Sequence, residues 1–262
     1  MGDYILNTVN YDYKTLNHEG FGGVCKYIAT PKRVGYPRLL VKHENIQSAC
    51  NTFMCSRLAE LCGVYTPKAY LMSTSGETRR LFPMHPFIVG TEWVENFSAV
   101  DYDRVKESPV LRQQYLDSMA LYAMFCRIAD TPQFACSSTK GVFAYDWDEA
   151  FDVTDFVIKL SLYNTDAGTE QLRRMLQHFS QHPFESDAEL CLRSAAEHMT
   201  ADANNLRPSY MQAMERLCKV TEEQVADLTD VLADIYPMGL IVYYEEYIKL
   251  LQAKVKTYIG TM

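Results

Sequence analysis

Residues 142–151 read Val-Phe-Ala-Tyr-Asp-Trp-Asp-Glu-Ala-Phe, a short apolar strand that runs into carboxylates. Asp130 stands sixteen residues before Asp146, after a long apolar segment. A hairpin over residues 133–146 would bring these two carboxylates to one edge. Either Asp alone is also typical of an ordinary helix end or strand end. Together they suit phosphoryl transfer, in which one carboxylate orients an acceptor hydroxyl and another holds Mg²⁺.

The segment before Asp130 predicts a long helix. Apolar residues from Leu111 to Ile128 recur at helical spacing. After the hairpin the last ~90 residues are predicted to be helical. Two capping boxes, Ser186-x-x-Glu189 and Thr221-x-x-Gln224, mark helix starts, and Pro208 suits the first turn of another helix.

The first ~85 residues are predicted to be rich in strands, with one helix. Residues 24–29 and 38–42 are apolar runs on either side of a Pro- and Gly-containing turn, which predicts a hairpin. Residues 45–62 have helical periodicity, and Gly63 is a natural stop. Extended segments are expected at 65–72 and 81–89.

These patterns predict an α+β protein of two lobes. A small lobe, residues 1–88, holds an antiparallel sheet and one helix. A larger and mainly helical lobe, residues 89–262, holds one hairpin, and the join lies near residues 82–92. The 262 residues are enough for one large domain or two modest ones, and 48% hydrophobic content excludes a disordered chain.

Two features of the small lobe point to phosphate. The turn Asn-His-Glu-Gly-Phe-Gly-Gly at residues 17–23 contains Gly20, Gly22 and Gly23, which would let backbone N–H groups approach a phosphate chain. Lys42 ends the apolar strand Leu-Leu-Val-Lys, where an anion would satisfy its charge. A plain hairpin turn and a solvent-facing lysine are the alternatives.

The sequence resembles the HipA-like kinases, which share a bilobal fold with protein and phosphoinositide kinases. The resemblance lies in the order of its parts: a glycine-rich turn, a strand Lys, a helix, an Asp, a hairpin and a second Asp. The resemblance runs from about Lys14 to Phe151. It is carried best by Leu-Leu-Val-Lys at 39–42, by Ser-Arg-Leu-Ala-Glu-Leu-Cys-Gly-Val-Tyr-Thr-Pro at 56–67 and by Tyr-Asp-Trp-Asp-Glu-Ala-Phe at 145–151.

The resemblance implies a role for each of these residues. Lys42 and the Gly20, Gly22 and Gly23 backbone would hold the phosphates of ATP, Asp146 would bind Mg²⁺, and Asp130 would be the catalytic Asp. The hinge that reads adenine would lie near residues 81–87. The phosphate acceptor would be a Ser or Thr of a protein substrate.

The sequence departs from the family at two positions. The family usually has D-x-H-x-x-N around the catalytic Asp, whereas Pro132 and Ala135 stand here in place of His and Asn. Gln133, Ser137 or Asp148 could substitute for that Asn as a metal ligand. The Glu expected in the small-lobe helix is replaced by Thr52, beside Asn51. These departures leave a pseudokinase, acting as a nucleotide-binding or protein-interaction module, as the alternative. An unrelated α+β protein is a third possibility.

Composition excludes other classes of function. The net charge of −8 argues against direct nucleic-acid binding. That charge divides into a net +4 over residues 1–90 and −12 over residues 91–262. The eight cysteines form no C-x-x-C pair, which favours free thiols in a reducing cytosol. The start lacks signal-peptide features, and the apolar run 240–244 is too short to span a bilayer, so we expect a cytoplasmic protein without membrane contact.

Two weaker signals remain. His178 and His182 have the spacing of a zinc pair, but no Glu accompanies them and Pro183 follows at once, so we do not expect a metal site. Tyr243, Tyr244 and Tyr247 are predicted to pack in a core, with a partner surface as the alternative.

Overall fold

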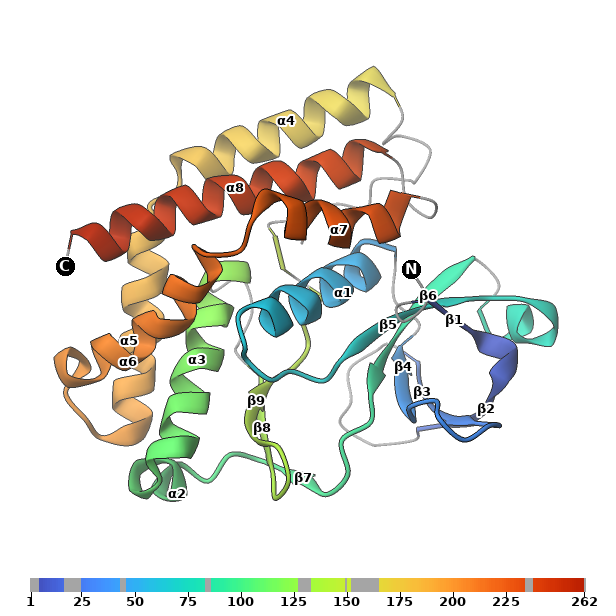
Figure 1. The fold of residues 1–262 in the computed structure, drawn as a ribbon, viewed down its shortest axis with the longest axis horizontal. Helices are drawn as coiled ribbons and strands as arrows, with labels where there is room; N and C mark the ends of the chain where they lie inside the picture. Colours follow the sequence, from blue (N-terminus) through green and yellow to red (C-terminus); the bar gives the residue numbers. More distant parts are fainter. Residues whose placement is uncertain are drawn as a thin grey trace.

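The computed structural model describes residues 5–16, 25–42, 46–82, 86–126, 133–148, 150–151, 165–233 and 238–261. A six-stranded sheet forms the first part of the chain, and helices with a small three-stranded sheet form the rest (Figure 1). The predicted α+β architecture is confirmed.

The large sheet has the strand order β1-β5-β6-β4-β3-β2. Only β1 and β5 run parallel; the other neighbours in this sheet are antiparallel. The predicted hairpin of β3 and β4 is confirmed, with Ala29 opposite Leu39. The strands are β1 (Ile5–Asn7), β2 (Tyr11–Thr15), β3 (Lys26–Pro31), β4 (Leu39–Lys42), β5 (Ala69–Ser73) and β6 (Phe87–Glu92), and short 3-10 turns lie at η1 (Thr8–Asn10) and η2 (Gly76–Arg80).

The strand β6 belongs to this sheet and spans the predicted boundary at residue 88, which stays a prediction. Within the extended segment expected at 81–89, β6 begins only at Phe87, and Leu81 is the helical C-cap residue of η2. Phe82 lies in the small apolar core of the sheet with Tyr11 and Val41.

The helix α1 (Ile46–Leu61) is buried on nearly all sides. The sheet covers it through β5 and β6, and α6 of the helical lobe also contacts it. Gly63 follows with φ +64°, the left-handed conformation that favours glycine at a helix end. A helix in this position must pair its buried polar side chains inside the protein.

The helical lobe is built around α3 (Pro109–Phe125), which contacts α5, α6 and β9. α8 crosses the molecule beside α4 and α7 (Figure 1). Its tyrosines Tyr243, Tyr244 and Tyr247 are at most 1% exposed, which confirms the prediction of core packing. The other helices are α2 (Tyr102–Glu107), α4 (Asp166–Gln181), α5 (Phe184–Met199), α6 (Ala203–Leu217), α7 (Glu222–Ala233) and α8 (Met238–Gly260).

The hairpin predicted over residues 133–146 is confirmed as β8 (Phe134–Ser137) and β9 (Gly141–Ala144). A two-residue strand, β7 (Phe97–Ser98), pairs with β8 and completes a three-stranded sheet. Sequence analysis did not predict β7, because two residues carry no periodicity.

Of the predicted helix starts, one is confirmed and two are wrong. Thr221 and Gln224 exchange the two hydrogen bonds of a capping box, at 2.9 and 3.2 Å. α5 begins before Ser186, with Pro183 at its N-cap. Pro208 lies inside α6 rather than in its first turn, because Asp202 caps that helix.

All eight cysteines are free thiols, as predicted. Five of them, in α1 and α5 and directly after α1 and α3, are buried; these are Cys50, Cys55, Cys62, Cys126 and Cys191. Within the described ranges, no helix has the length and apolar character needed to cross a membrane.

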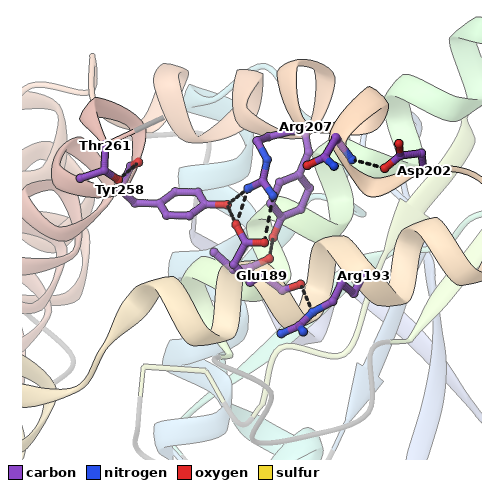
Figure 2. Close-up of polar contacts among 9 residues, drawn as sticks. Glu189, Arg193, Asp202, Arg207, Tyr258 and Thr261 are labelled. Atoms are coloured by element: carbon purple, nitrogen blue, oxygen red, sulfur yellow. Dashed lines mark hydrogen bonds and ion pairs between the residues drawn. The ribbon is translucent and has the colours of Figure 1, made fainter.

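A polar cluster fastens α8 to α5 and α6 (Figure 2). Arg207 donates to both carboxylate oxygens of Glu189, and the Tyr258 hydroxyl donates to Glu189 Oε1 at 2.7 Å. The hydrogen bond from Arg207, reinforced by that from Tyr258, lowers the pKa of Glu189 although burial opposes the shift. The cluster therefore stabilises the folded state while Glu189 is ionised.

We predict that Glu189→Gln lowers the free energy of unfolding by about 1–2 kcal/mol near neutral pH. The folded pKa of Glu189 lies below its unfolded value. Its contribution is therefore fully present above the unfolded pKa and is lost as pH falls through the folded one. Urea unfolding near neutral pH and at about pH 3 measures this, and wild type and variant should converge in acid. An equal difference at both pH values would contradict the prediction.

Candidate active site

A cavity of about 300 Å³ lies between the large sheet and the β8–β9 hairpin. Apolar side chains from both lobes form most of its walls, and a few polar groups join them, as is usual for small-molecule sites. The residues that line it are Leu16, Lys26, Leu40, Lys42, Thr52, Pro67, Val89, Thr91, Glu92, Trp93, Val94, Phe97, Gln133, Ala135, Phe143, Tyr145, Asp146 and Trp147.

Lys42 and Asp146 meet in this cavity as an ion pair. Lys42 is the last residue of β4, and Asp146 follows β9, so the two lobes each supply one partner. Only 13% of the Lys42 side chain and 15% of the Asp146 side chain are exposed. Each of these two poorly exposed charges compensates the other. A phosphate could take the place of Asp146 beside Lys42, and a cation could take the place of Lys42 beside Asp146.

The backbone at Asp146 is left-handed, with φ +68°. A non-glycine residue in this conformation carries strain, which persists only where the surroundings impose it. Trp147 next to it is 2% exposed and packs against Phe125. Burial raises the pKa of the neighbouring Tyr145, and Asp146 adds to the shift, so Tyr145 enters the cavity as a neutral phenol.

Two neighbouring polar residues of α1, Asn51 and Thr52, make different contacts. Thr52, which stands where the family has a Glu, lines the cavity, and its buried Oγ1 has no hydrogen-bond partner among the described residues. Asn51 is directed elsewhere: its Nδ2 donates to the carbonyls of Asp148 and Ala150. The helix therefore contacts the chain after Asp146 through an amide.

The end of β6 and the segment after it form one side of the cavity, through Glu92, Trp93 and Val94. Of the hinge predicted near residues 81–87, residues 83–85 lie outside the described residues, and none of the others is among the described lining residues. The hinge assignment stays a prediction. The Trp93 amide donates to the Arg38 backbone carbonyl at 2.8 Å. The Arg38 guanidinium lies 5.3 Å from the centroid of the Trp93 ring. These contacts hold the segment against the sheet.

The other predicted site residues lie outside the described residues. These are Asp130 and the glycines Gly20, Gly22 and Gly23. Their assignments as the catalytic residue and as phosphate-binding residues stay predictions.

Among the three substitutes considered for the missing Asn, only Gln133 is among the described residues that line the cavity. Its carbonyl accepts from the Tyr145 amide at 3.1 Å, which fixes Gln133 beside Asp146. Ser137 is buried in the hairpin turn and accepts from the Lys140 amide. Ala135 itself lies in the cavity wall.

Sequence reasoning missed the apolar lining, chiefly Val89, Trp93, Val94 and Phe143. Such residues have the same pattern whether they pack in a core or face a ligand. The one sequence feature that could have indicated this wall of the cavity is the polar pair Thr91 and Glu92 at the end of an apolar strand.

Of the two histidines with the spacing of a zinc pair, His182 pairs with a carboxylate instead. His182 Nε2 lies 2.6 Å from Asp187 Oδ2 and joins the end of α4 to α5. Across the residues that the structure describes, no three His, Cys, Asp or Glu side chains are grouped to hold a metal.

The architecture was compared with solved structures. The proinflammatory kinase CtkA of Helicobacter pylori superposes with a TM-score of 0.51 at 11% identity, over 98% of this chain and 97% of that one. The protein has a kinase-like fold. The resemblance to HipA-like kinases is thus confirmed at the level of the fold.

A further similar structure is HipA in the complex of HipA, HipB and operator DNA from the toxin–antitoxin system of Shewanella oneidensis MR-1. It has a TM-score of 0.45 and 11% identity, over 92% of this chain and 62% of that one. No family model matches the sequence, and no curated protein does.

We predict that Lys42→Met lowers the free energy of unfolding by about 1–3 kcal/mol, because it leaves the Asp146 carboxylate without its cation. Asp146→Asn should also destabilise, and the double variant should lose less than the sum of the two losses, by about 0.5–3 kcal/mol. Urea unfolding of the four proteins gives this coupling energy. Additive losses would mean that the pair does not form in solution.

Proposed function

We propose that the protein is an ATP- and Mg²⁺-dependent phosphotransferase of the HipA-like kind. The observation that supports this most is the ion pair of Lys42 and Asp146 inside a cavity between the two lobes of a kinase-like fold. A strand lysine and a carboxylate that follows a hairpin are the two groups that such enzymes use at the phosphates and the metal.

The cavity suits a nucleotide base. Leu40 and Val89 from the sheet and Phe143 from the hairpin give apolar surfaces against which a flat ring could pack. The Glu92 and Trp93 amides donate to the Lys68 and Arg38 carbonyls, which keeps the backbone of residues 92–94 in place before a ligand arrives. The other backbone groups of these three residues would supply hydrogen bonds to the edge of adenine.

The residues present also fit Mg²⁺. This ion binds oxygen and is commonly held by one or two carboxylates together with substrate phosphates, so it needs no larger cluster of protein ligands. Asp146 would supply the carboxylate and Gln133 an amide oxygen in place of the missing Asn. When bound, Mg²⁺ would neutralise charge on the phosphates.

The chain's own groups would then divide the work. Lys42 would exchange its contact with Asp146 for phosphate oxygens, which leaves the Asp146 carboxylate available to the metal. Asp130, by resemblance, would orient the acceptor hydroxyl. We propose a Ser or Thr of a cytoplasmic protein as acceptor, since the net −12 of residues 91–262 suits a basic partner.

A second candidate is a pseudokinase that binds nucleotide without transferring phosphate. Two lining residues favour it: Ala135 places a methyl group where a metal ligand is expected, and Thr52 cannot pair Lys42 as a Glu would. The two candidates share the cavity and differ only in turnover.

We predict that the purified protein binds Mg-ATP and phosphorylates itself or an added protein. Asp130→Ala and Asp146→Ala should each lower the rate at least about 100-fold, because each removes a group that acts on the reacting phosphate or hydroxyl. Transfer of labelled phosphate measures the rate, and circular dichroism checks that the variants fold.

The control is Asp187→Asn, which removes a buried carboxylate of the helical lobe that lies outside the described cavity lining. Nucleotide binding without turnover in wild type would support the pseudokinase instead. Absence of any nucleotide binding would reject both candidates.

A further inference from the structure

The chain that follows Asp146 is held in an unusual conformation at both ends. Asp146 has φ +68° and Phe151 has φ +61°. A non-glycine residue in the left-handed region is strained unless surrounding contacts compensate. The residues between them therefore decide whether the Asp146 carboxylate stays beside Lys42.

One of these contacts comes from α1. Asn51 is 1% exposed, and its Nδ2 donates to the Asp148 carbonyl and to the Ala150 carbonyl, both at 2.9 Å. Its Oδ1 accepts from the Tyr244 hydroxyl at 2.6 Å. Asn51 thus joins the chain after Asp146 to the C-terminal helix, and its amide orientation is fixed by all three hydrogen bonds.

Further contacts come from α8 and from the end of α3. Tyr243 donates its hydroxyl to the Phe151 carbonyl at 2.6 Å. The Phe151 ring meets those of Tyr244 and Tyr247 edge to face, with centroids 5.3 and 5.4 Å apart. The Phe151 amide donates to the Phe125 carbonyl at 2.8 Å. Both backbone polar groups of this left-handed residue are therefore satisfied in a fully buried position.

We propose that Asn51, Tyr243 and Tyr244 are positioning residues for Asp146. They fix the chain after Asp146 from the opposite side to the cavity, and so hold the carboxylate where it meets Lys42. In this chain the small-lobe helix acts on the metal-binding carboxylate through Asn51 rather than on the lysine through a Glu. The proposal rests on the proposed function for its catalytic meaning.

The C-terminal helix is then part of the site although it does not touch the cavity. None of the three residues is among the described lining residues, so their effect is transmitted through the backbone carbonyls of Asp148, Ala150 and Phe151. Outer residues that orient a metal ligand commonly change metal affinity by ~10–100-fold when they are replaced.

The test compares two conservative variants on one helix. Tyr244→Phe removes only the hydroxyl that holds Asn51. Tyr258→Phe removes an equally buried α8 hydroxyl that donates to Glu189, in the cluster of Figure 2. Tyr244→Phe loses the hydrogen bond to Asn51, and Tyr258→Phe loses those to Glu189 and Arg207, so a general loss of stability affects both.

We expect Tyr244→Phe to raise the Mg²⁺ concentration for half-maximal ATP binding about tenfold, measured by titration calorimetry at fixed ATP. Tyr243→Phe should act in the same direction, and Tyr258→Phe should leave the midpoint unchanged. Asn51→Leu should have a larger effect, but it leaves two buried carbonyls unpaired and could prevent folding, so the tyrosine variants carry the test.

A second measurement needs no nucleotide. The coupling energy between Lys42 and Asp146, from the four-protein cycle described above, should fall to less than about half in the Tyr244→Phe background. It should persist in the Tyr258→Phe background. If the wild-type protein binds no Mg-ATP, the proposed function fails and this coupling alone decides the positioning proposal. Unchanged coupling in Tyr244→Phe, or an equal change in Tyr258→Phe, would overturn it.

Discussion

The burial of α1 is the constraint on which the rest of the structure depends. A helix packed between a sheet and another helical lobe cannot turn a polar face to water. Several of its polar side chains find partners inside: Arg57 donates to the Ala69 carbonyl of β5 within the same lobe, and Asn51 joins the chain after Asp146 to α8. The burial that fixes the helix therefore also fixes the site.

This arrangement explains how a chain without the usual helix Glu keeps an ordered ion pair. In kinases that carry the Glu, the helix acts on the lysine. Here the two charges pair directly, Thr52 occupies the cavity wall, and the amide of Asn51 holds the backbone beyond the carboxylate. The ion pair of Lys42 and Asp146 has no net charge, so it is compatible with an apolar cavity.

Much of the fold could be predicted because the deciding signals are local. The β3–β4 hairpin, α1, α3 and the β8–β9 hairpin each have their own periodicity and breakers, and all four are confirmed. The start of α5 was misplaced because Ser186 and Glu189 form a capping pattern two residues inside a helix that Pro183 begins. The parallel pairing of β1 with β5 and the strand β7 depend on contacts between distant segments, which no local pattern encodes.

The sequence by itself determined the order of the elements, the charge difference between the two lobes and the residue types available for phosphate and metal. Tertiary structure alone decided that Lys42 meets Asp146, that residues 92–94 border the cavity, and that Gln133 is the substitute that lines it. It also brought Tyr243 to the Phe151 carbonyl and Tyr244 to Asn51. The physical reason is range: propensity and capping act over a few residues, whereas an ion pair or a buried hydrogen bond joins residues about a hundred or more positions apart.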